Sequence, residues 1–159
     1  MTRYFRMLSV AALLAAVLAP ALARAAGGEE PSTKATDPVI EQALAANAAK
    51  DYVRSAAILK DALAHNANNA DYHNLYAYAL RKGPNPDWTL VFQQYQEALR
   101  IDPDHRKAHE YIGEAYLMTG ELAKAKEHLA ALDRLCTFGC DEYSDLKKAV
   151  AAFEQIKPR

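Results

Sequence analysis

The sequence predicts an all-α protein, and three observations support this prediction. Past Asp37 the apolar residues recur at helical spacing, strand signals are missing, and alanine, which close helix packing requires, is abundant. The segment DYHNLYAYALRKG (71–83) aligns without gaps on AHEYIGEAYLMTG (108–120), an offset of 37 residues. DALAHNA (61–67) aligns on EALRIDP (97–103), an offset of 36. Such periods on helical sequence predict stacked helix pairs, each needing a neighbour to bury its apolar face.

Residues 1–25 have the pattern of a secretory signal peptide. Arg3 and Arg6 precede an apolar run over 7–18, and A-x-A cleavage sites end at Ala23 and at Ala25. The run is shorter than the about 20 apolar residues that span a bilayer. We therefore expect cleavage at one of the two sites, a periplasmic or secreted protein, and no stable membrane insertion afterwards.

The rest of the chain reads as an extended linker over 26–36 and one domain over 37–156. Without residues 1–25, 16 basic and 20 acidic residues remain, a net charge of about −4. A mildly acidic chain disfavours nucleic acid, which requires clustered lysine and arginine. The domain is large enough to form its own core.

Two repeats resemble the tetratricopeptide repeat family. The matching residues of the middle repeat are Tyr72, Leu75, Tyr76, Ala79, Gly83, Val91, Tyr95, Ala98, Leu99 and Pro103. Those of the last repeat are His109, Ile112, Gly113, Tyr116, Gly120, Ala125, Leu129 and Leu132. A first repeat over 39–63 matches more weakly. The resemblance implies a short right-handed solenoid of about three helix pairs.

The turn GPNPDWT (83–89) is longer than the family's usual turn, and its two prolines keep a helix from running through it. We expect Trp88 in this turn to pack on Val91 and Phe92 of the following helix. A tryptophan that contacts a ligand is the alternative.

The segment 141–156 predicts a C-terminal capping helix, which a repeat array needs to cover its last apolar face. Tyr143, Leu146, Val150 and Phe153 lie on one helical stripe. Asp141 is the expected N-cap.

Cys136 and Cys140 are the only cysteines, and they stand between the last repeat and the cap. The spacing does not fit haem attachment, which needs C-x-x-C-H, or the C-x-x-C of a thioredoxin-like pair. Zinc usually takes four ligands, and no further cysteine or histidine is near in sequence. An oxidising compartment and an even count favour a disulfide, with Gly139 in the left-handed conformation between the two cysteines.

Groups for catalysis are not recognisable in the sequence, so we expect no enzyme activity, no cofactor and no metal. The histidines His105 and His109 are interpreted as structural. The resemblance implies instead a scaffold whose first helices line a concave groove that holds a peptide or a partner helix. The alternative is a metal- or thiol-handling module that uses Cys136 and Cys140 with a histidine.

By the family's geometry, the groove stripe of the middle repeat comprises His73, Asn74, Ala77 and Arg81. That of the last repeat comprises Lys107, Glu110, Tyr111, Glu114 and Met118. Asn74 and Lys107 match the carboxylate clamp of some members, whereas Ile40, Leu44 and Tyr111 replace its other groups, which argues against carboxylate capture. We expect the stripe to be exposed, so that truncating Arg81 and Tyr111 together would leave stability nearly unchanged.

Overall fold

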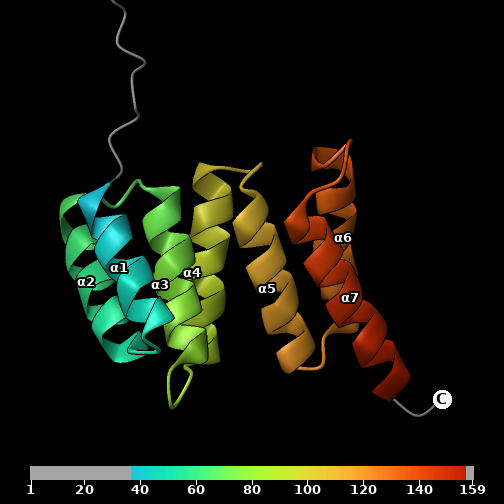
Figure 1. Ribbon diagram of the computed structural model, residues 1–159, viewed down its shortest axis with the longest axis horizontal. Coiled ribbons are helices and arrows are strands. Elements are labelled where there is room, and N and C mark those ends of the chain that lie inside the picture. Colours follow the sequence, from blue (N-terminus) through green and yellow to red (C-terminus); the bar gives the residue numbers. More distant parts are fainter. Residues whose placement is uncertain (1–36, 157–159) are drawn as a thin grey trace, which may run out of the picture. The chain divides into compact units, whose positions relative to one another are not determined.

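The computed structural model describes residues 37–156, and every regular element in that range is a helix (Figure 1). The helices are α1 (Pro38–Ala48), α2 (Tyr52–His65), α3 (Ala70–Lys82), α4 (Trp88–Ile101), α5 (Arg106–Met118), α6 (Leu122–Leu135) and α7 (Asp141–Ile156). The all-α prediction is confirmed. The signal peptide, its cleavage sites and the linker over 26–36 lie outside the described residues. None of the helices in 37–156 is long and apolar enough to cross a bilayer.

Most helices begin at a polar side chain that caps the first turn. Asp37, Asp51, Asn69, Asp87 and His105 each accept a hydrogen bond from a backbone N–H two or three residues on, at 2.8 to 3.2 Å. Such caps satisfy N–H groups that have no partner within the helix.

Helix α7 begins differently from the expectation. Asp141 is its first helical residue and not the N-cap, so that part of the prediction is wrong. Cys140 stands before it, and its Sγ lies 3.4 Å from the Tyr143 N–H donor. The sulfur therefore occupies the place of a capping oxygen.

The helices form three consecutive pairs, α1–α2, α3–α4 and α5–α6, and α7 packs on both α5 and α6. The first helices also contact one another in order, α1 with α3 and α3 with α5. Helices α1, α3, α5 and α7 thus form one layer, and α2, α4 and α6 form the other (Figure 1). The prediction of three pairs and a capping helix is confirmed.

Two clusters make up the core. The smaller one joins α1, α2 and α3 through Ala43, Leu59, Tyr72, Leu75 and Tyr76. The larger one runs from α3 to α7 and includes Tyr95, Ile112, Leu132 and Leu146, all at most 1% exposed. Leu80 packs against both clusters and connects them.

Two glycines and one tryptophan explain three local features. A Cβ on Gly113 would lie 2.6 Å from a Leu146 methyl group, so glycine lets α7 approach α5 closely. Gly139 has φ +85°, in the left-handed region as expected. Trp88 opens α4, packs against the larger core cluster, and its ring centroid lies 6.1 Å from that of Phe92, which confirms the packing interpretation.

Candidate binding surface

A cleft of about 250 Å³ opens between α1, α3 and α5, and we call it the first-helix cleft. Its walls are Leu44, Asn47, Ala48, Leu75, Tyr78 and Tyr111. It lies on the layer that the resemblance assigned to the groove. Three successive first helices contribute to it, so the stacking of the repeats creates the site.

Tyr78 and Tyr111 form the aromatic wall of this cleft. Their ring centroids lie 4.8 Å apart, and the ring of Tyr52 meets Tyr78 edge-on at 6.3 Å. Burial raises the pKa of both Tyr78 and Tyr111, so their hydroxyls remain protonated near neutral pH. A pair of tyrosines offers a ligand an apolar ring face together with a hydroxyl.

Arg81 lies next to the two rings, and its guanidinium group binds to other side chains of the protein. Its guanidinium carbon is 5.4 Å from the Tyr78 centroid and 5.7 Å from that of Tyr111. Its Nη2 donates to Glu114 at 2.8 Å, and only 4% of the side chain is exposed. The expectation that Arg81 is an exposed groove residue is therefore wrong, and its removal with Tyr111 would not be neutral for stability.

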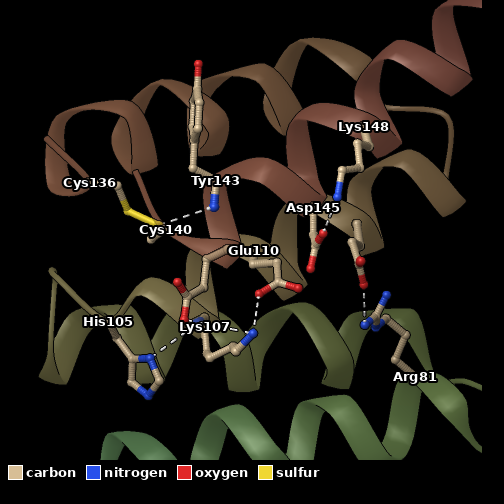
Figure 2. A network of polar contacts seen from close by, with 12 residues as sticks. Arg81, His105, Lys107, Glu110, Cys136, Cys140, Tyr143, Asp145 and Lys148 are labelled. Atoms are coloured by element: carbon tan, nitrogen blue, oxygen red, sulfur yellow. Dashed lines mark hydrogen bonds and ion pairs between the residues drawn. A yellow bond between two sulfur atoms is a disulfide. The ribbon is translucent and has the colours of Figure 1, made fainter. Parts of the chain in front are cut away.

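Lys107 is paired as well (Figure 2). Its ammonium group lies 2.9 Å from Glu110, 3.9 Å from Glu142 and 5.6 Å from the Tyr111 ring centroid. Burial raises the pKa of the Glu110 carboxyl, and the hydrogen bond from Lys107 opposes that rise. Both cations next to the cleft thus already have carboxylate partners.

The predicted stripe of α3 is buried, contrary to expectation. His73, Asn74 and Ala77 are at most 7% exposed, like Arg81. The ring of His73 hydrogen-bonds the Ala67 carbonyl at 2.9 Å and the Gln94 side chain at 2.7 Å. The physical reason is that α3 is enclosed by α1, α2, α4 and α5, which leave little of its circumference to solvent.

The residues of the predicted α5 stripe differ in their exposure to solvent. Glu110 is buried at 5% exposure, whereas Lys107, Tyr111 and Glu114 are half-buried and Met118 is 57% exposed. The sequence analysis assigned no role to Asn47 or Tyr78. Tyr78 carries a weak signal, because it stands one helical turn after Asn74 of the predicted stripe.

The two cysteines form the expected disulfide, with their Cα atoms 5.6 Å apart. Ligand atoms of Cys136, Cys140 and Glu142 lie within 4.8 Å of one another, the one group of this kind in residues 37–156. While the disulfide holds both sulfurs, neither is a thiolate that could bind a metal.

Within residues 37–156, no histidine contributes a ligand atom to this group. His105 caps α5 and pairs with Asp71 at 3.1 Å. His109 and His128 face each other with their Nδ1 atoms 2.9 Å apart, between α5 and α6. Burial lowers the pKa of both rings, that of His128 to about 4, so the pair is neutral at pH 7.

Three solved structures share this fold. SycD of Yersinia enterocolitica, a type III secretion translocator chaperone, has 13% identity and TM-score 0.63 over 74% of this chain and 81% of its own. SycD in complex with a peptide of the translocator YopD has 15% identity and TM-score 0.62 over 79% and 94%. The first TPR domain of human RPAP3 has 16% identity and TM-score 0.59 over 75% and 94%.

These likenesses show that residues 37–156 have a tetratricopeptide-repeat-like fold. At such low identity they show the fold alone. No protein-family model matches the sequence, and no curated protein matches it significantly.

Proposed function

We propose that this chain is a non-catalytic, periplasmic or secreted scaffold that binds a peptide or a partner helix on the α1–α3–α5 layer. The first-helix cleft is the observation that supports this proposal most directly. It is concave, has two tyrosine rings and two leucines in its walls, and is bordered by half-exposed apolar groups. Aromatic anchors in a small apolar recess are typical of the energetic centres of protein interfaces.

The similar structures support the same function. SycD is named as a translocator chaperone, and one of its structures holds a peptide of YopD. The RPAP3 domain carries the repeat fold in a human protein. Carried over to this chain, these names favour a protein or peptide partner.

The contacts change which residues we assign to binding. Leu44 (48% exposed), Tyr78, Tyr111 and Met118 offer apolar surface on this layer. His73, Ala77 and Arg81 lie beneath that surface and support it. Because Arg81 and Lys107 are paired, we assign the affinity to apolar burial rather than to attraction of an acidic partner.

A capture experiment with one matched control tests this function. The chain is used as bait in a periplasmic extract, beside Leu44→Lys and Val53→Lys. Both residues are exposed aliphatics, at 48% and 67%, but Val53 is on α2 and outside the cleft. We expect a protein that binds the wild type and Val53→Lys but is lost with Leu44→Lys. Loss with Val53→Lys alone, or no partner at all, would contradict the proposal.

A second candidate function rests on the cysteine group. Reduced Cys136 and Cys140 with Glu142 would offer two sulfurs and one carboxylate oxygen to a soft cation. Metal analysis of protein purified with and without a thiol reductant separates the two candidates. Stoichiometric metal in the reduced protein, lost in Cys136→Ser, would favour a metal-handling module over the scaffold.

A further inference from the structure

We infer that the first-helix cleft recognises a main-chain amide next to an aliphatic side chain, rather than a terminal carboxylate, and that Asn47 makes the recognising contact. The inference rests on the proposed function and names the chemistry of the partner. An internal segment of an extended peptide has this chemistry.

Asn47 carries an unsatisfied amide at the wall of the cleft. Its Nδ2 and Oδ1 atoms are both buried, and neither has a hydrogen-bond partner within residues 37–156. A buried amide without partners costs free energy, so such a group calls for an explanation. One donor and one acceptor side by side are complementary to the C=O and N–H of another amide.

Asn74 adds a second unsatisfied acceptor on α3. Its side chain is 3% exposed, and its Oδ1 also has no partner among the described residues. Asn74 stands one helical turn before Tyr78, so the two share a helix face. The side-chain oxygens of Asn47 and Asn74 therefore both need donors, which a peptide N–H supplies and a carboxylate does not.

The charges around the cleft also disfavour a carboxylate. Arg81 is paired with Glu114 at 2.8 Å, and Lys107 with Glu110 at 2.9 Å. An incoming carboxylate would have to displace one of these acidic partners or lie near both of them. A neutral amide leaves both ion pairs intact, so it is the better ligand.

The walls and size of the cleft define the side chain that accompanies the amide. Leu44 and Leu75 line it together with Tyr78 and Tyr111. Its volume of about 250 Å³ is below the range of about 300–1,000 Å³ that is usual for whole small-molecule ligands. One aliphatic residue of a longer chain is the size of occupant that we assign to it.

A fragment titration tests the inference. The probes are N-acetyl-L-leucinamide and N-acetyl-L-leucine, which differ in an amide against a carboxylate, added to the ¹⁵N-labelled protein at neutral pH. We expect the leucinamide to shift the Asn47 side-chain NH₂ signal and to bind at least about tenfold more tightly than the acid. A Kd of about millimolar is normal for a ligand of this size. Equal or tighter binding of the acid would overturn the inference.

Asn47→Leu removes the donor and the acceptor while keeping a side chain of similar size. We expect leucinamide binding to weaken at least about tenfold, with an unchanged or higher Tm, because an unpaired polar group has left the interior. Asn68→Leu is the control, since Asn68 is exposed outside the cleft. If Asn47→Leu fails to fold, Asn47→Asp keeps the shape, removes the donor and is expected to lose binding too. A lower Tm with unchanged binding would show that Asn47 is only structural.

The capture experiment and the fragment titration can contradict the scaffold proposal and the amide inference independently of each other. If Leu44→Lys loses a captured protein but leucinamide leaves Asn47 unshifted, the surface binds a partner and this amide inference is wrong. If Leu44→Lys keeps every partner while leucinamide binds through Asn47, the scaffold proposal is wrong and the cleft is a small-ligand site.

Discussion

The two ends of the repeat array differ in how completely they are closed. At the C-terminal end, α7 packs on α5 and α6 and inserts Leu146, which is fully buried, against Gly113. At the N-terminal end, the helices that contact α1 within residues 37–156 are α2 and α3, and the buried residues of α1 are Ala43 and Ala46. Leu44 stays 48% exposed there.

This difference separates stability from recognition. Large side chains and a close helix contact at the C-terminal end bury apolar area, which stabilises the fold. Small alanines at the N-terminal end bring α1 close to α3 but fill less space, and the first-helix cleft remains. We therefore expect mutations near α7 to change unfolding and mutations on α1 to change binding.

Truncation of one leucine at each end gives the largest contrast. Leu146→Ala should lower the free energy of unfolding by roughly 2 to 5 kcal/mol, because it empties a fully buried site. Leu44→Ala should change it by less than about 1 kcal/mol, because this side chain is already half exposed. Urea denaturation followed by circular dichroism measures both. Equal losses would mean that the two ends are equally packed.

The ion pair between Arg81 and Glu114 should contribute more to the free energy of unfolding than an exposed ion pair. Arg81→Ala removes a charge-assisted hydrogen bond from a 4% exposed side chain, so we expect a loss of roughly 1.5 to 3 kcal/mol. Arg100→Ala breaks a pair in which the arginine is 64% exposed, and we expect a change of less than about 1 kcal/mol. Thermal melts of both variants check this order. A neutral Arg81→Ala would contradict the assignment of Arg81 to a stabilising ion pair.

The disulfide should act locally on the closed end. Replacing Cys136 and Cys140 with serine opens a short loop, and the chain-entropy estimate gives a loss of about 2 kcal/mol. Hydrogen exchange should accelerate mainly in α7, with little change in α1. Uniform acceleration along the chain would show that the disulfide supports the whole array.

The pair of His109 and His128 should have the smallest effect on stability. The pKa of His128 is about 4 in the folded protein, below its unfolded value. The contribution of neutral His128 to the free energy of unfolding is therefore fully present above about pH 6.5. This contribution is lost as the pH falls toward 4. Between pH 7 and 5.5 the loss should be less than about 1 kcal/mol, because solvent partly screens the half-buried ring. His128→Leu should flatten this part of the Tm-against-pH curve. An unchanged slope in His128→Leu would contradict the neutral pair.

The sequence predicted the features that depend on local pattern. Helical spacing and the 36- to 37-residue offsets predicted the helix pairs, and the stripe with Leu146 predicted the cap. Two cysteines without further candidates nearby predicted the disulfide. In each case the residues that determine the structure are close in sequence or repeat at a fixed period.

The surface was harder to predict, because exposure on α3 depends on helices distant in sequence. Family geometry placed Arg81 on an open groove, yet Glu114 and two tyrosine rings from α3 and α5 enclose it. Asn47 lies in the weakest repeat, and no pattern distinguishes an unpaired amide from a paired one. Only the packed neighbours of these residues define their roles.

A photo-crosslinking amino acid placed at two exposed positions tests the central claim most directly. It replaces Leu44 beside the first-helix cleft in one protein and Val53 on α2 in another, and both are irradiated in periplasmic extract. We predict one dominant crosslinked partner from position 44, reduced by an excess of chain without the crosslinker, and none from position 53. The same partner from position 53 alone would place binding on the other layer and contradict the account.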